Sequence, residues 1–351
     1  MLNENDTRLI EFQHLLFSLC PENYKSTLSQ IQQSTFYSQK EGFTQLIHSI
    51  KAIYKINDEL SDLCTNLLID MSPNITAFFS MEEIIHLFSF HEYKSIIYQL
   101  REHNIITNAF LSEAYIIGST EYGYFMLPKG DHLKKLAINP DELAIAIRKD
   151  NFEDFQTIIS NSNLDINMTI DNSQYERFNF INCRPTLLEF SAFFRSIIIF
   201  KYLLMNGAKL TPKLPKFATA GGNYEIIHIL ESRNMSFDGC LDIAIAYFRE
   251  DLINYFIETK NYQFSISSLV SAIMNYNYEY FFKILQETKN INEITQYAFG
   301  TVMSPLHAAA ENGYLDIVKI LCSLPDIDLN VRVPIFLVLF LFLYDPFAFS
   351  C

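Results

Sequence analysis

Residues 304–321 read SPLHAAAENGYLDIVKIL, and this stretch decides the fold because it encodes a complete helix–turn–helix unit. Ser304 suits a helix N-cap, and Pro305 follows at the first helical position, where its missing N–H costs nothing. Gly313 marks the turn, where a positive φ is expected. The second helix has an apolar stripe made by Ile317, Val318, Ile320 and Leu321. So short a pair cannot bury this stripe alone, which predicts stacked copies of the unit.

Five other segments share the phase of this unit. Each has a small residue in the middle of its first helix, and the six anchors are Ala146, Ser191, Ala218, Ala244, Ala272 and Ala309. The positions three residues before, nine after and twelve after the anchor are apolar in every segment. Unrelated amphipathic helices would share a helical period but not this common phase. These shared positions, or columns of the alignment, therefore predict six units over residues 141–332 that all have the same sequence phase.

The turn position, four residues after the anchor, is less regular. It is glycine only at Gly222 and Gly313, and the other units have Asp150, Arg195, Phe248 and Tyr276. An asparagine, which tolerates left-handed backbone, follows this position at Asn151, Asn223 and Asn277. The residue with left-handed backbone could therefore be one of these asparagines instead. Most of the central units lack the glycine of residues 304–321 at the turn, so we describe the central units as degenerate.

The motif Ser304-Pro305-Leu306-His307, with Ala309 and Gly313, resembles the T-P-L-H signature of the ankyrin repeat. The likeness continues through residues 186–194, 202–208 including Gly207, 221–227 and 240–245. Together these blocks resemble the divergent ankyrin-type domains of unknown function that are expanded in some unicellular parasitic protists. The resemblance implies an all-α fold, an ankyrin-repeat α-solenoid, with a helical N-terminal region before it. It also implies protein–protein recognition, and it brings no catalytic residue.

The units differ in length. Successive anchors are 45, 27, 26, 28 and 37 residues apart, whereas a full ankyrin repeat has ~33 residues. The short units are therefore expected to lack the extended β-finger. The longest gap contains a polar stretch from Asp165 to Pro185, which we expect to be a long surface loop.

Residues 1–140 are predicted to form either a helical N-terminal region or degenerate capping repeats. Apolar periodicity predicts helices near residues 9–19, 45–54, 60–69 and 96–100. Ser80-Met81-Glu82-Glu83 is a capping-box sequence that precedes a further apolar run. The region carries no chemical signature.

Charge and cysteine content limit the class of protein. The formal net charge is −14 and no cluster of Lys and Arg is present, which argues against nucleic-acid binding. The six cysteines form no C-x-x-C pair, which favours reduced thiols in a cytoplasmic protein. The first residues lack the features of a secretory signal. The expected partner is a protein whose identity the sequence does not give.

The sequence predicts no catalytic, cofactor-binding or metal-binding site. His307 is expected to be structural, with hydrogen bonds to the neighbouring unit. His86 and His91 are five residues apart and so lie on different helix faces. Gly221-Gly222-Asn223 lacks the Lys and Ser/Thr of a phosphate loop, so we interpret it as a helix–helix turn. The aromatic residues within 276–282 are interpreted as core side chains, with surface binding anchors as the alternative.

Residues 333–351 are an atypical apolar tail. Its uninterrupted apolar run, residues 335–344, is short for a membrane span of ~20 residues. Three interpretations are open: an altered end of the reading frame, a hydrophobic segment packed on the last repeat, and a tail anchor. The sequence thus predicts a non-enzymatic scaffold or adaptor that binds a protein through the concave face of its repeats. A membrane-associated adaptor, anchored by residues 335–344, is the alternative.

Overall fold

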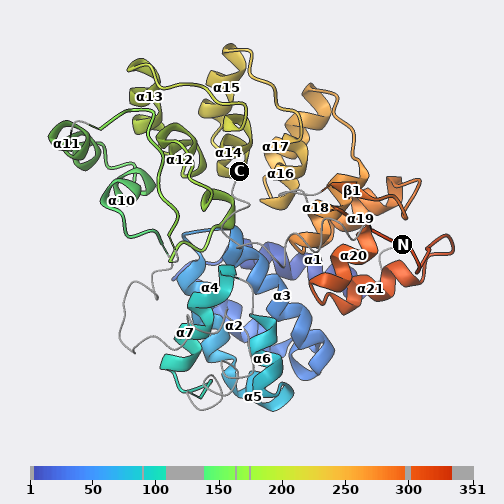
Figure 1. The fold of residues 1–351 in the computed structure, drawn as a ribbon. Coiled ribbons are helices and arrows are strands. Elements are labelled where there is room, and N and C mark those ends of the chain that lie inside the picture. Colours follow the sequence, from blue (N-terminus) through green and yellow to red (C-terminus); the bar gives the residue numbers. More distant parts are fainter. Residues whose placement is uncertain are drawn as a thin grey trace. The chain divides into compact units, whose positions relative to one another are not determined.

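The computed structural model describes residues 4–88, 91–107, 138–162, 164–173, 175–296 and 302–333. They fall into two compact units (Figure 1). Unit 1 comprises residues Met1–Pro140 with Ser173–Phe180, and unit 2 comprises Asp141–Asn172 with Ile181–Cys351. Apart from two short strands, the regular elements of the described residues are helices, so the all-α class is confirmed.

Unit 1 is built around one long helix. Its elements are α1 (Glu4–Phe17), α2 (Tyr24–Gln33), η1 (Thr35–Ser38), α3 (Lys40–Ile56), α4 (Ser61–Asp70), α5 (Ser72–Phe78), α6 (Met81–Leu87), η2 (His91–Tyr93) and α7 (Lys94–Glu102). Most side chains of α3 are buried. The predicted capping box is confirmed at α6, where the Glu83 N–H donates to Ser80 Oγ at 3.2 Å and the Ser80 N–H donates to Glu83 Oε2 at 2.8 Å.

The polar stretch expected to be a surface loop is partly core. Arg177 is 3% exposed, and its Nη2 donates to Asp58 Oδ1 at 2.6 Å. The guanidinium lies 5.0 Å from the centroid of the Tyr54 ring. Glu176 is 2% exposed and accepts from the Asn139 N–H at 3.1 Å. The surface-loop prediction is therefore wrong for these residues, because paired charges can be buried where isolated ones cannot.

Unit 2 consists of helix pairs in chain order (Figure 1). The pairs are α10 (Glu142–Arg148) with α11 (Phe152–Ser162), α12 (Leu187–Phe193) with α13 (Ile197–Met205), α14 (Leu214–Gly221) with α15 (Tyr224–Ser232), α16 (Cys240–Ala246) with α17 (Glu250–Asn254), α18 (Ile266–Met274) with α19 (Tyr278–Glu287), and α20 (Pro305–Glu311) with α21 (Leu315–Cys322). Every first helix contains one predicted anchor. Each first helix packs on the next first helix, from α10 through to α20.

Four smaller elements of the described residues accompany these pairs, and the first of them spans the boundary in sequence between unit 1 and unit 2. A 3-10 turn, η4 (Asn179–Ile181), precedes α12. A π-helical turn, η5 (Tyr255–Thr259), continues α17. Strands β1 (Thr295–Gln296) and β2 (Val302–Met303) pair antiparallel before α20.

Polar caps explain where several first helices begin. The Asp141 side chain caps α10, and Ser265 forms a capping box at α18. At α12 the Thr186 side chain accepts from the Glu189 N–H, while the Glu189 carboxylate accepts from the Thr186 N–H. Each cap satisfies backbone donors that have no partner within the helix.

The turn within each pair uses a left-handed residue. The φ angles are +81° at Gly222, +68° at Gly313, +50° at Asp150, +60° at Arg195, +54° at Phe248 and +51° at Tyr276. The alternative placement on asparagine is wrong, because Asn151, Asn223 and Asn277 instead accept from N–H groups in the first turn of the second helix. In five turns the N–H five residues after the anchor donates to the anchor carbonyl at 2.8–3.0 Å, as in a Schellman motif.

Side chains just after the turns join neighbouring pairs. Each donor lies five residues after its anchor and reaches a carbonyl near the end of the preceding first helix. The bonds run from Ser196 Oγ to Ile147 O at 2.5 Å, from Arg249 Nη2 to Ala220 O at 2.7 Å, and from Asn277 Nδ2 to Ile245 O at 2.9 Å. They satisfy carbonyls at helix ends and fix one pair against the next.

Among the residues that the structure describes, no helix combines the length and apolar character that a membrane crossing requires. The apolar run 335–344, on which the tail-anchor prediction rests, lies outside the described residues.

Candidate interaction surface

The signature residues of the last pair lie in its cap, core and turn. Ser304 caps α20, and its Oγ lies 2.7 Å from His307 Nδ1. Within the described residues, the hydrogen bonds of His307 thus stay inside its own pair, whereas bonds to the neighbouring unit were expected. The buried members of the signature in this pair are Ser304, Pro305, Ala309, Ile317 and Leu321, and the half-buried ones are Leu306, His307 and Val318.

The signature glycines have separate roles. Gly207 and Gly313 follow the ends of helices and have φ of +84° and +68°. A Cβ at either position would meet no atom within 4 Å. At Gly222 a Cβ would meet Arg249 Cδ at 2.8 Å. At Gly221 a Cβ would meet the Ala192 carbonyl oxygen at 2.3 Å, because α14 approaches α12 closely there. Gly221-Gly222-Asn223 is therefore a helix–helix turn, as interpreted.

Other candidate residues are structural or form no cluster. Tyr276, Tyr278 and Tyr280 are 0%, 1% and 4% exposed, so they are core side chains. In the described residues, no group of three or more His, Cys, Asp and Glu side chains is placed to hold a metal ion.

Exposed side chains are distributed unevenly within the pairs. The first helices α12, α16 and α18 have no exposed residue, and α14 exposes only Lys216. In contrast, four of the five exposed large apolar side chains in the described residues lie on second helices: Ile198 at 54%, Met205 at 80%, Tyr224 at 39% and Leu315 at 57%. The second helices are therefore the better candidate for a binding surface.

A polar and aromatic cluster lies on the second helices of the third and fourth pairs. Lys260 Nζ is 2.7 Å from Glu231 Oε1, and the Tyr255 hydroxyl donates to the same oxygen. His228 Nδ1 is 3.0 Å from Glu231 Oε2. The His228 ring lies between two tyrosines, with centroid distances of 6.1 Å to Tyr224 and 6.3 Å to Tyr255.

Electrostatics explains why this cluster holds together. Burial alone raises the pKa of Glu231, but hydrogen bonds from Lys260, Tyr255 and His228 outweigh it, so the pKa falls below its usual value. The hydrogen bond to Glu231 raises the pKa of Lys260. The π-helical turn η5 begins at Tyr255, and such turns are frequent at functional sites.

One sequence pattern marks the exposed face of the second helices. Seven residues after the anchor, in the first turn of the second helix, five units have an acid: Glu153, Glu225, Asp251, Glu279 and Asp316. The second unit has Ile198 instead, an apolar residue in an acidic row. The Glu231 cluster gives no such signal, because its residues occupy no common column.

Stacked helix pairs with one shared turn geometry define a helical repeat protein of the ankyrin type. Residues 303–332 match the ankyrin repeat, and residues 205–284 match a domain of unknown function, DUF3447. Both matches are consistent with a divergent ankyrin-type protein, and the second spans Tyr224, Glu231 and Tyr255. No curated protein matches the chain.

Proposed function

We propose that this chain is a cytoplasmic adaptor that binds a protein partner through its helix pairs and performs no catalysis. The ankyrin repeat at residues 303–332 is a protein-interaction module, and this supports the general role. The observation that carries the proposal is the aromatic and charged cluster with Tyr224 exposed and Tyr255 half-buried, held on a hydrogen-bonded stack. Tyrosine on a rigid surface is a frequent source of binding energy, since little conformational entropy is lost on binding.

Partner capture with the full-length protein tests this function. The variant Ala272→Asp places a charge at a fully buried anchor and disrupts the stack. The matched variant Ser232→Asp adds the same charge at an exposed position on α15. We expect a saturable partner that the Ala272→Asp variant loses and the Ser232→Asp variant keeps. The proposal would be contradicted if the Ala272→Asp variant still bound the partner although its repeats were unfolded, or if no partner bound saturably.

The apolar run at residues 335–344 motivates a membrane-associated variant of this function. Cell fractionation distinguishes the two. An adaptor anchored by this run stays with the membrane fraction until residues 335–344 are deleted, whereas a cytoplasmic adaptor stays in the supernatant with or without them.

A further inference from the structure

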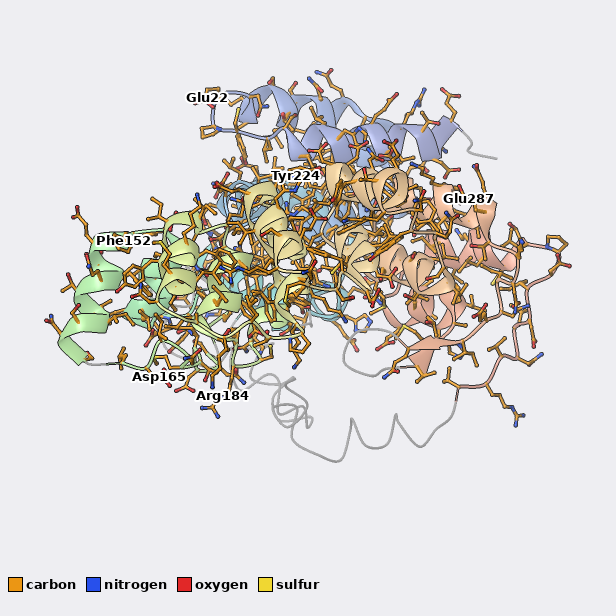
Figure 2. The ribbon with its side chains drawn as sticks, turned by 90° about the horizontal axis from the view of Figure 1, so that it is seen from above. Glu22, Phe152, Asp165, Arg184, Tyr224 and Glu287 are labelled. Carbon is orange, nitrogen blue, oxygen red and sulfur yellow. The ribbon has the colours of Figure 1, made fainter. Side chains whose placement is uncertain are left out.

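Two exposed apolar side chains on neighbouring second helices share one edge of unit 2. Ile198 lies in the first turn of α13 and is 54% exposed, and Tyr224 begins α15 and is 39% exposed (Figure 2 labels Tyr224). An ion pair between Lys201 and Glu225 holds α13 beside α15. Neither side chain is needed for the core, because Ile199 and Ile226 fill the buried positions of the same turns.

The edge carries negative charge next to Tyr224. Glu250 and Asp251 open α17 and are both exposed, and neither forms an ion pair within the described residues. Asp251 lies one helical turn before Tyr255, because its carbonyl accepts the Tyr255 N–H. The Tyr255 ring is next to the His228 ring, which in turn is next to Tyr224. The raised pKa of the Tyr224 hydroxyl, caused first by burial and then by the Asp251 carboxylate, agrees with this placement. Glu225 is already paired with Lys201. The uncompensated charge therefore lies on the α17 side of Tyr224.

We propose that this edge binds an arginine-bearing segment of a partner protein, with an aliphatic side chain against Ile198 and a guanidinium between Tyr224 and Asp251. The inference rests on the proposed function and specifies its surface. Arginine fits better than lysine, because a planar guanidinium stacks on a tyrosine ring while it donates two hydrogen bonds to a carboxylate. A lysine ammonium is more strongly hydrated and does not offer this paired geometry.

Methyl nuclear magnetic resonance on the full-length protein tests the proposal. The Ile198 methyl signal, assigned by an Ile198→Val variant, is followed while acetyl-Leu-Gly-Arg-amide is added. The same peptide with lysine or with citrulline in place of arginine provides the comparison. We expect a saturable shift of the Ile198 signal with arginine, and a Kd at least fivefold weaker with lysine or citrulline.

Variants separate a specific site from general attraction to an acidic protein. Tyr224→Ala and Asp251→Asn should each weaken arginine-peptide binding at least fivefold. Glu287→Gln, which removes one exposed charge at the end of α19 (Figure 2), should change it less than twofold. Equal binding of the arginine and lysine peptides, equal loss in all three variants, or no shift at Ile198 would overturn the proposal. If partner capture succeeds while these tests fail, the adaptor function stands and this edge is not its surface.

Discussion

The left-handed residues at the turns show how individual side chains connect the repeats. A non-glycine residue in this conformation costs roughly 1–2 kcal/mol, yet Asp150, Arg195 and Tyr276 all adopt it. Each has a side chain that reaches the next pair. Asp150 accepts from the Ile198 and Ile199 N–H groups, Arg195 Nε donates to Gly221 O at 2.6 Å, and Tyr276 donates to Asp316 Oδ2 at 2.6 Å. Glycine would remove the strain together with the bond.

Two substitutions at Arg195 separate the energetic cost of its positive φ from the contribution of its hydrogen bond. Arg195→Gly and Arg195→Ala both lose the hydrogen bond to Gly221 O, but only alanine keeps the cost of a positive φ. We expect both variants to be less stable than the wild type, with the glycine variant more stable than the alanine variant by about 1 kcal/mol. Urea denaturation measures the difference, and equal stability of the two variants would show that the turn is not left-handed.

Lys51 in unit 1 predicts a pH dependence of stability. The side chain is 5% exposed, its Nζ lies 4.7 Å from the Tyr93 ring centroid, and it donates to the Leu87 carbonyl. Burial lowers its pKa from 10.5 to about 7. Above pH 7 the unfolded chain therefore holds a proton that the folded unit releases, and stability rises with pH.

The expected slope is up to about 1.4 kcal/mol per pH unit between pH 7 and 8.5. Hydrogen exchange of α3 amides, corrected for the intrinsic rate, measures it, and the Lys51→Met variant serves as the control. The wild-type slope should exceed that of the variant. Identical slopes would mean that Lys51 stays charged through this range.

At the scale of elements, the helix pairs were predictable and their exposed faces were not. Apolar columns recur in every pair and side-chain caps in several of them, and these local signals are sufficient to predict the first helices of unit 2. The π-helical turn at Tyr255 has no sequence signature. The Glu231 cluster joins residues that are 24 and 29 positions apart in sequence, so its existence depends on how α15 packs beside η5.

The contact between Tyr276 and Asp316 links the fifth pair to the sixth. Tyr276→Phe removes a hydrogen bond to a carboxylate at a site where both residues are buried, which costs about 1.5–3 kcal/mol. Because each repeat contacts only its neighbours, we expect faster hydrogen exchange in α20 and α21 and unchanged exchange in α10 and α11. A uniform increase over all pairs would mean that the array unfolds as one cooperative block.

At the scale of the molecule, residues 173–180 belong to the core of unit 1 although they lie between helices of unit 2 in sequence. The polar composition of residues 165–185, which include the charged Glu176 and Arg177, predicts a surface loop. Their partners, Asn139 and Asp58, are far away in sequence. Only the three-dimensional structure could reveal that these charges are paired and buried.

Arg177 should therefore be essential to unit 1. Arg177→Ala removes this ion pair and empties the space over the Tyr54 ring, at a cost of about 1–3 kcal/mol, because the Asp58 carboxylate left behind is partly exposed to solvent. Hydrogen exchange in α3 and α4 should rise strongly. The exposed variant Arg184→Ala, whose side chain pairs with Asp171 at the surface, is the control and should change little. Equal effects of the two variants would show that the buried pair contributes no more than the exposed one.

Unit 2 contains six helix pairs in one sequence phase, and the turn of each pair has a left-handed residue four positions after its anchor. A crystal structure of the full-length protein tests it most directly, through the backbone at the four turns that lack glycine. We expect a positive φ at Asp150, Arg195, Phe248 and Tyr276, with each anchor in the first helix of its pair. A negative φ at any of these residues, or an anchor displaced from its first helix, would contradict it.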